Sequence, residues 1–398
     1  MFQIIACIFI IIQIIRFLRL FEACTPPKLY HSGTNFASKV LKRCPSLTQV
    51  YEPPGIWGKC GHIQTFFYGK IGRFNTPLPL GERFYKTLPS KETITYDIFQ
   101  PLNDHKTRGD YTILVCPGIA NSSEKSYVRT FVKYATESGF RVCVLNHIGS
   151  LANVKLTSPK IFTYGDTRYF ASMIETVEKM YSDSTFLIVG YSMGGNIAMK
   201  YLGENSERQK KILCGVSLCQ GYDAVRSTEP MKIGYRRVIY NRMITTNIKK
   251  IIRPHWDDLF SSGDSNQQSA NYDADQIRSA KFLHDIEDGL LRRIDGHESV
   301  YAYMDKAGCC HVIDKVNIPV LLVNTEDDPV VVNDVHDIPK NYSESHPEAI
   351  FATYKFGGHL GYYTGSWYKP DDVTLVEKMI IEYIDSIIDI RQKKVHAD

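Results

Sequence analysis

The stretch that decides the fold is Leu187-Ile188-Val189-Gly190-Tyr191-Ser192-Met193-Gly194-Gly195-Asn196-Ile197-Ala198-Met199-Lys200-Tyr201-Leu202. It begins as an apolar run typical of a strand, passes through Gly-x-Ser-x-Gly, and continues with apolar residues at helical spacing. A strand that becomes a helix within a few residues needs a sharp bend, and small neighbours such as Gly190 and Gly194 make the strained backbone tolerable. We therefore expect the Ser192 hydroxyl to stand exposed above the edge of a sheet, as a nucleophile.

The composition is that of a folded globular protein. Of 398 residues, 43% are hydrophobic and 23% are charged, and the length suits one large α/β domain with an insertion or two domains. A net charge of +4 is too small to indicate a nucleic-acid partner. The ten cysteines include no pair of Cys-x-x-Cys units, and we expect neither a metal nor another cofactor.

The N-terminus is apolar and predicts a membrane anchor over residues 1–21. Phe2 to Ile15 contains two polar residues, both glutamine, and Arg16 and Arg19 follow. This run is short for a bilayer span of about 20 residues, but it reaches that length if the arginines extend to the interface. No basic segment precedes it and no cleavage site follows, which favours a single-pass anchor over a cleaved signal peptide.

The orientation of this anchor stays open. The arginines follow the apolar run and would keep that side of the membrane cytosolic. Asn121-Ser122-Ser123 and Asn341-Tyr342-Ser343 are glycosylation sequons, which matter only for a lumenal or extracellular body.

Strand and helix patterns alternate after an irregular N-terminal wrap over residues 22–90, which has a strand-like patch at 62–67. Residues 91–398 form the predicted hydrolase domain, and Glu92–Phe99 alternates as a half-exposed edge strand would. Buried strands are predicted at 111–116, 140–145, 185–191, 212–219, 319–324 and 350–356, with helices at 127–137, 170–181 and near the C-terminus. This order predicts an α/β fold with a mostly parallel central sheet covered by helices on both faces.

About a hundred residues separate two of these strands, and we interpret residues 222–316 as a cap inserted over the nucleophile. Between Met231 and His255 this insertion carries seven basic residues and no acidic one, with isoleucines interleaved. Such a stretch can be the solvated face of a cap helix or can lie on an anionic membrane surface.

An acid and a base follow in the chain. Asp327 and Asp328 come directly after a buried strand and compete for the role of orienting a histidine. Asp328, directly before Pro329-Val330, is selected, which leaves Asp327 as a turn or helix-capping residue. His359 lies between glycines at the end of the last strand, and the order Ser, Asp, His is that of an α/β-hydrolase.

An oxyanion hole needs two backbone N–H groups aimed at the developing negative oxygen. We expect one from Met193, directly after the nucleophile. The other is expected from Ile119 in the Pro117-Gly118-Ile119 turn, where Gly118 allows a close approach to the substrate.

Several segments resemble the YheT-type α/β-hydrolases, and within them the α/β-hydrolase domain-containing protein 2 subgroup. The resemblance runs from about Trp57 to the end of the chain. The segments that carry it are Cys116-Pro-Gly-Ile-Ala-Asn121, Val144-Leu-Asn-His-Ile-Gly149, Phe162-Thr-Tyr-Gly165, Gly194-Gly-Asn-Ile197, Lys200-Tyr-Leu-Gly-Glu204, Cys219-Gln-Gly-Tyr222, Leu322-Val-Asn324, Asp327-Asp-Pro329 and Gly357-Gly-His-Leu-Gly361.

This resemblance implies Ser192, Asp328 and His359 as nucleophile, acid and base, and hydrolysis of acylglycerols or other lipid esters, most of all monoacylglycerols. It also implies an N-terminal membrane anchor of type II orientation and a steroid ligand as regulator. An acyltransferase that uses the same serine, and a steroid- or lipid-binding receptor without turnover, stay open as alternatives. His105 and Asp110 have the His-x4-Asp spacing proposed for acyl transfer in some relatives, but they precede a strand and lie at its far end from the nucleophile.

Overall fold

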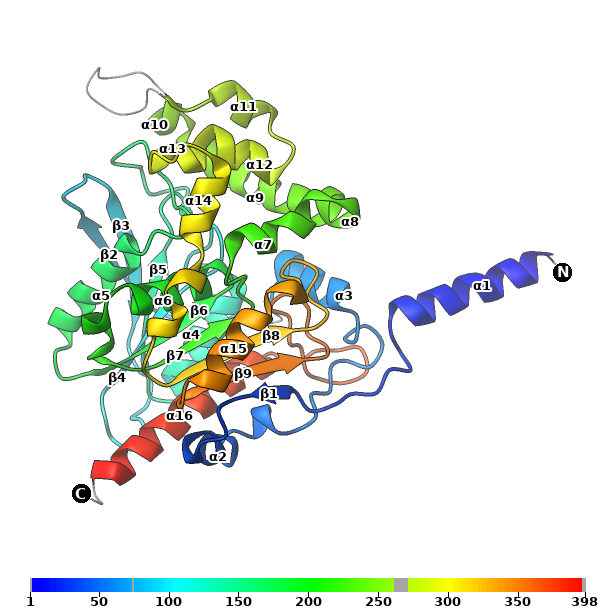
Figure 1. Cartoon of the computed structure of the whole chain (residues 1–398), viewed down its shortest axis with the longest axis horizontal. Helices are drawn as coiled ribbons and strands as arrows, with labels where there is room; N and C mark the ends of the chain where they lie inside the picture. Colours follow the sequence, from blue (N-terminus) through cyan, green and yellow to red (C-terminus); the bar gives the residue numbers. More distant parts are fainter. Residues whose placement is uncertain (1, 74, 261–270, 396–398) are drawn as a thin grey trace.

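A nine-stranded, mostly parallel sheet forms the centre of the protein (Figure 1). The computed structural model describes residues 2–73, 75–260 and 271–395. The strand order is β1-β9-β8-β7-β6-β4-β5-β3-β2, and the six strands from β9 to β5 in this order run parallel. The strands are β1 (Lys28–Tyr30), β2 (Glu82–Thr87), β3 (Thr93–Phe99), β4 (Tyr111–Cys116), β5 (Arg141–Asn146), β6 (Thr185–Tyr191), β7 (Ile212–Leu218), β8 (Val320–Thr325) and β9 (Ala349–Tyr354). The predicted fold class is confirmed.

Helices cover both faces of this sheet because side chains alternate along each buried strand. In β4, Leu114 and Cys116 pack in one core with α5 (Arg168–Met180) and α6 (Met193–Glu204). The opposite face packs in a second core with α2 (Asn35–Leu41), α4 (Ser126–Glu137) and α16 (Leu375–Val395). Helix α15 (Asp337–Ser345) precedes β9.

A group of short helices lies between β7 and β8, in the region predicted as an insertion over residues 222–316. They gather over one end of the sheet, at the top of Figure 1. These helices are α7 (Ala224–Thr228), α8 (Gly234–Arg236), α9 (Arg242–Ile252), α10 (Trp256–Phe260), α11 (Ala274–Ser279), α12 (Leu283–Ile286), α13 (Arg292–Ile294) and α14 (Val300–Ala307). Residues 261–270 of the predicted insertion lie outside the described residues, as do residues 1 and 396–398 of the predicted anchor and hydrolase domain.

The N-terminal wrap is more regular than the sequence indicates. It supplies both edge strands of the sheet, because β1 pairs with β9 and β2 pairs with β3. The prediction of β3 as a half-exposed edge strand was therefore wrong: its residues from Ile94 to Phe99 are all buried between β2 and β5. The strand-like patch at 62–67 was also wrong, since Gly61–Phe66 forms helix α3, followed by a single π-helical segment, η2 (Phe67–Ile71).

The predicted anchor forms helix α1 (Phe2–Phe17), which projects away from the body of the protein (Figure 1). Sixteen residues at 1.5 Å per residue give a helix of roughly 24 Å, shorter than the hydrocarbon core of about 30 Å. Within the described parts of the chain, no helix combines the length and the apolarity that crossing a membrane requires. The predicted membrane span over residues 1–21 is thus not supported.

A buried ion pair ties the wrap to the C-terminal helix. The Arg73 guanidinium lies 3.2 Å from the carboxylate of Glu377 in the first turn of α16, and both side chains are at most 2% exposed. Arg73 also donates to the carbonyl oxygens of Leu360 and Gly361, at 3.3 and 3.2 Å. One side chain therefore satisfies groups from two segments that are distant in the sequence.

Replacing Arg73 by methionine should destabilise the fold strongly, because it leaves the Glu377 carboxylate buried without its counter-charge. We expect Arg73→Met to lower the free energy of unfolding by about 3–5 kcal/mol, measured by urea titration. Lys39→Met, at an exposed position on α2, is the matched control and should change it by less than about 0.5 kcal/mol. Equal stability of the two variants would contradict a structural role for the Arg73–Glu377 pair.

Candidate active site

Ser192 occupies the turn between β6 and α6. Its backbone has φ 53° and ψ −121°, a left-handed conformation that residues other than glycine rarely adopt. The turn is fixed because the Ser192 N–H donates to the Leu218 carbonyl at 2.7 Å. A Cβ atom added at Gly190 would collide with the Gly194 carbonyl, so the turn closes only with glycine there. The serine hydroxyl consequently stands at the carboxyl ends of the parallel strands.

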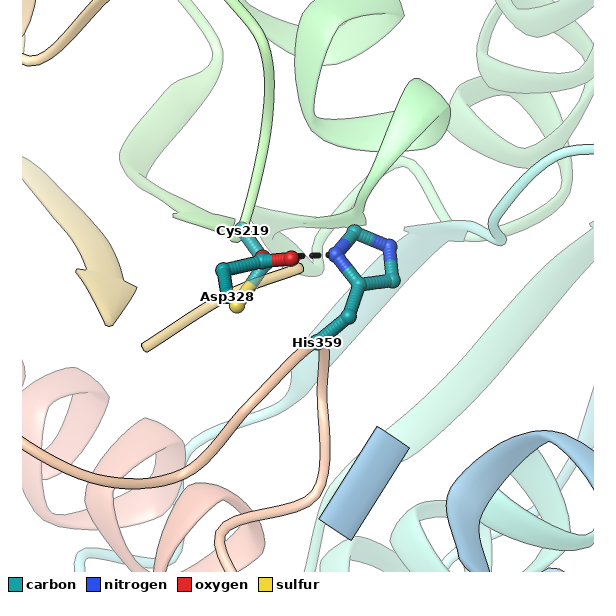
Figure 2. Close-up of side chains that lie close together, drawn as sticks. All are labelled: Cys219, Asp328 and His359. Atoms are coloured by element: carbon teal, nitrogen blue, oxygen red, sulfur yellow. Dashed lines mark hydrogen bonds and ion pairs between the residues drawn. The ribbon is translucent and has the colours of Figure 1, made fainter. Parts of the chain in front are cut away.

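His359 connects Ser192 to an aspartate. Its Nε2 lies 3.0 Å from Ser192 Oγ. Its Nδ1 lies 2.7 Å from Asp328 Oδ2, and Figure 2 shows this contact between His359 and Asp328. Asp328 is 4% exposed and His359 7% exposed. With Nδ1–H donating to the carboxylate, Nε2 is free to accept the serine proton. The three side chains can thus support nucleophilic attack by a serine.

Two adjacent aspartates have different surroundings. Asp328 Oδ1 accepts from the N–H groups of Val330 and Val331, at 2.7 and 2.9 Å, and Oδ2 faces the histidine. Asp327 Oδ1 instead accepts from the Gly358 N–H at 2.8 Å, whereas its Oδ2 has no hydrogen-bond partner among the described residues and lies 3.8 Å from Arg19. Burial raises the pKa of Asp327 to about 7, against the lowering effects of the Gly358 N–H and Arg19.

The two expected oxyanion donors lie beside the serine. Met193 is the first residue of α6, and no hydrogen bond from its N–H or from that of Ile119 to another described residue is found. The turn that carries Ile119 approaches Ser192 closely, since a Cβ atom built on Gly118 would lie 3.6 Å from the Ser192 Cβ. Met193 and Ile119 stay the predicted oxyanion donors.

Residues of the N-terminal wrap hold the His359 loop, which sequence patterns did not indicate. The Thr65 hydroxyl on α3 accepts from the His359 N–H at 2.8 Å and donates to the Gly61 carbonyl at 2.7 Å. Together with Arg73, which binds the next two carbonyls, Thr65 fixes the loop backbone on both sides of the imidazole. Neither residue belongs to a motif, and only their position in the folded chain identifies them.

His147 supports the turn expected to supply one oxyanion donor. Its Nε2 lies 2.9 Å from the Pro117 carbonyl oxygen, to which it donates. Burial lowers the pKa of His147 to about 4, so the imidazole is neutral at physiological pH. The structure therefore indicates a supporting role for His147.

Cys219 lies with Asp328 and His359 in an arrangement that could hold a metal ion, with one ligand atom from each within 4.8 Å of the others (Figure 2). The chemistry of these groups fits a metal poorly. Burial raises the pKa of the Cys219 thiol well above its usual range, so it does not provide a thiolate. The Asp328 carboxylate and His359 Nδ1 already bind each other.

Two cavities meet at Ser192. The larger, of about 510 Å³, is also lined by His359. The smaller, of about 140 Å³, is lined by Met193 and mainly by apolar side chains from loops that follow the strands and from the inserted helices. Ile119 and Ile244 line both. A cavity of several hundred Å³ is of the size that binds small organic molecules.

The remaining sequence candidates lie elsewhere or are otherwise engaged. Asn121 lines the larger cavity and its amide donates to Tyr127 Oη at 3.2 Å, which disfavours glycosylation there. Asn341 is exposed on α15. His105 binds Asp385 of α16 at 3.0 Å, and Asp110 binds Arg141, so neither residue contacts the serine.

Comparison with known proteins places this arrangement in a family. Residues 111–366 match the alpha/beta hydrolase fold. The chain belongs to the α/β-hydrolase family. Among its relatives is the human protein named monoacylglycerol lipase ABHD2, 42% identical over 96% of this chain and 91% of the relative. A zebrafish (Danio rerio) protein of the same name is 41% identical over 96% of this chain and 88% of the relative. The Drosophila melanogaster abhydrolase domain-containing protein 2 is 35% identical over 95% of both chains.

These findings confirm the predicted resemblance to the α/β-hydrolase domain-containing protein 2 subgroup. They also confirm the predicted enzyme class of this α/β-hydrolase, a carboxylic ester hydrolase.

The raised pKa of Asp327 predicts a pH effect on stability. Between the usual pKa of about 4 and the folded-state value of about 7, the folded protein holds a proton that the unfolded chain releases. The contribution of Asp327 to the free energy of unfolding is therefore at its maximum below pH 4 and is lost as the pH rises through 7. Asp327→Asn should remove this loss, so its free energy of unfolding should gain on wild type by up to about 1.4 kcal/mol per pH unit across this window.

Urea titrations from pH 4 to 8 test this effect, with the exposed Asp334→Asn as matched control. The control should follow wild type at every pH. A constant difference between Asp327→Asn and wild type over the whole range would contradict the protonation of Asp327 in the folded protein.

Proposed function

We propose that this α/β-hydrolase cleaves carboxylic esters of lipids, most of all monoacyl esters of glycerol such as the monoacylglycerols, through an acyl-enzyme formed on Ser192. The observation that carries the proposal is the continuous hydrogen-bonded path from Ser192 through His359 to Asp328. The relatives named monoacylglycerol lipase support the substrate class.

In the first half of the reaction, His359 Nε2 removes the Ser192 proton as Oγ attacks the ester carbonyl. The Met193 and Ile119 N–H groups bind the negative oxygen of the tetrahedral intermediate. His359 then gives its proton to the leaving glycerol oxygen as the ester C–O bond breaks. Asp328 stabilises the imidazolium throughout, with its other oxygen held by two backbone N–H groups.

In the second half, water takes the place of the alcohol in the larger cavity. His359 removes a proton from this water, which attacks the acyl carbonyl and releases the fatty acid and Ser192. The helices inserted between β7 and β8 act in this proposal as the cap that covers the acyl chain. Support comes from the smaller cavity, which is lined both by residues of loops that follow the strands and by residues of the insertion.

Ser192→Ala should abolish hydrolysis of a monoacylglycerol, with a fall in kcat of about 10⁶, because the nucleophile is removed. Asp328→Asn should lower kcat by about 10⁴ because the imidazole loses its orientation and its counter-charge. The measurement is fatty-acid release from 1-oleoylglycerol by the full chain in neutral detergent micelles. Ser206→Ala, at an exposed position after α6, is the matched control and should retain full activity.

Activity of Ser192→Ala equal to that of the control would exclude the acyl-enzyme mechanism. The same assay with an added acceptor alcohol separates the alternatives. Transfer of the acyl group to the alcohol in preference to water would identify an acyltransferase, whereas absence of turnover in the folded wild type would favour a receptor.

Membrane contact is part of the proposal, and its support is the surface of α1. Eight of its large apolar side chains are exposed by half or more, namely Ile4, Ile5, Ile8, Phe9, Ile10, Ile11, Ile14 and Phe17. An apolar helix of this kind is stabilised by burial in lipid. Steroid regulation is proposed from the family resemblance alone, and no described residue is assigned to the steroid.

Charges placed on α1 should weaken lipid binding. Ile8→Glu combined with Ile11→Glu should lower co-sedimentation with phosphatidylcholine vesicles by at least tenfold, since two carboxylates oppose burial in hydrocarbon. The control combines Gln49→Glu and Ser206→Glu, which add the same charge at exposed positions of the body. Equal sedimentation of the two double variants would exclude α1 as the lipid contact.

A further inference from the structure

The two cavities at Ser192 have different relations to the proposed chemistry. His359 lines only the larger cavity, whereas Met193 lines only the smaller. The imidazole must hand its proton to the leaving oxygen, so the alcohol half of the ester belongs on the side of His359. The acyl half then extends into the smaller, apolar cavity. The larger cavity, of about 510 Å³, is consequently the site of the headgroup.

The charge of the larger cavity is positive. Lys70 of η2, Lys125 directly before α4, and Lys250 of α9 line it, and no aspartate or glutamate does. None of the three ammonium groups has a hydrogen bond or ion pair with any residue that the structure describes. The neighbouring Glu124 is bound by Arg83. These three exposed lysines gather positive charge on one cavity, which attracts an anion there.

The pKa of Lys125 reflects the positive charge of the cavity. Its pKa is lowered from the usual lysine value, first by desolvation and then by the positive charge of Lys250, while Glu124 acts in the opposite direction. Lys125 and Lys250 therefore repel each other across the cavity wall, although they come from distant parts of the chain. An anion between them would relieve this repulsion.

Neutral donors stand beside the lysines. Ser126, Asn121 and Asn247 line the same cavity and can donate hydrogen bonds to oxygen atoms. Lysine binds phosphate as a point charge, and a phosphate ester offers several oxygen acceptors at once. A free glycerol headgroup, by contrast, would leave all three ammonium groups without a counter-charge.

We propose that the larger cavity binds a phosphate-bearing headgroup, and that monoacyl glycerophosphates are the preferred substrates of this hydrolase over neutral monoacylglycerols. The inference rests on the proposed serine esterase function. In the reaction, the bond between Ser192 Oγ and the acyl carbon forms, and the bond from that carbon to the glycerol oxygen breaks. The leaving oxygen takes the proton from His359, and the phosphate stays bonded to glycerol throughout.

The test compares two lipids with the same acyl chain, 1-oleoylglycerol 3-phosphate and 1-oleoylglycerol, in neutral detergent micelles. We expect kcat/KM of the full-length wild type to be at least tenfold higher for the phosphate lipid, and this preference to fall with added salt. In Lys125→Met combined with Lys250→Met, the ratio of the two kcat/KM values should fall by about 10- to 100-fold, as expected for loss of charge-assisted hydrogen bonds. Lys125→Arg combined with Lys250→Arg, which retains the charges, should keep most of the preference.

Lys39→Met is the matched control, since this exposed lysine on α2 lies outside the cavity, and it should leave the ratio unchanged. A wild type that favours the neutral lipid, or a double methionine variant with an unchanged ratio, would overturn the inference. Competitive inhibition by inorganic phosphate without any preference for the phosphate lipid would also overturn it, because the cavity would then bind the free ion and not the headgroup.

These failures differ from a failure of the proposed function itself. If Ser192→Ala still cleaves both lipids, the serine mechanism is wrong whatever the headgroup preference. If Ser192→Ala is inactive on both and the wild type shows no preference for phosphate, the serine mechanism stands and only the headgroup inference is lost.

Discussion

The geometry of the candidate site depends on the backbone of the loop that carries His359. This loop must place an imidazole between a serine after β6 and an aspartate after β8, which belong to different strands. Gly358 gives the loop a left-handed turn with φ 55°, and a side chain there would collide with the Gly61 carbonyl. Asp327 and Thr65 accept hydrogen bonds from N–H groups of the loop and Arg73 donates to one of its carbonyl oxygens, which fixes the loop on both sides of the histidine. The imidazole is thereby held in position before any substrate binds, as electrostatic preorganisation requires.

The neighbouring carboxyl groups of Asp327 and Asp328 have different surroundings and different roles. Asp328 accepts hydrogen bonds from two backbone N–H groups through one oxygen, which orients its other oxygen toward His359 Nδ1. Asp327 is buried with one oxygen unsatisfied, and burial favours its neutral form. A second full negative charge beside the imidazole would compete with Asp328 for the proton. Asp327 instead accepts a hydrogen bond from the loop backbone. Its other oxygen lies close to Arg19, which follows the end of α1.

The two cavities at Ser192 differ in polarity and charge. In the proposed reaction, an apolar cavity on the side of Met193 and a cationic cavity on the side of His359 would orient an amphipathic ester with its carbonyl at Ser192. The lysines of the larger cavity come from η2, the start of α4, and α9. Wrap, core and insertion each contribute one positive charge, so the charge of the cavity exists only in the folded chain.

The sequence by itself determined the parts that are encoded locally. The apolar strand before Ser192, the glycines on both sides of it and the helix after it predicted the central turn, because these constraints act within a few residues. The order of Ser192, Asp328 and His359 along the chain is also visible in the sequence alone. Tertiary structure alone decided the rest. The wrap supplies both edges of the sheet, and Thr65 and Arg73 hold the loop that carries His359. Each of these depends on contacts between segments tens to hundreds of residues apart, and such contacts leave no periodic pattern in the sequence.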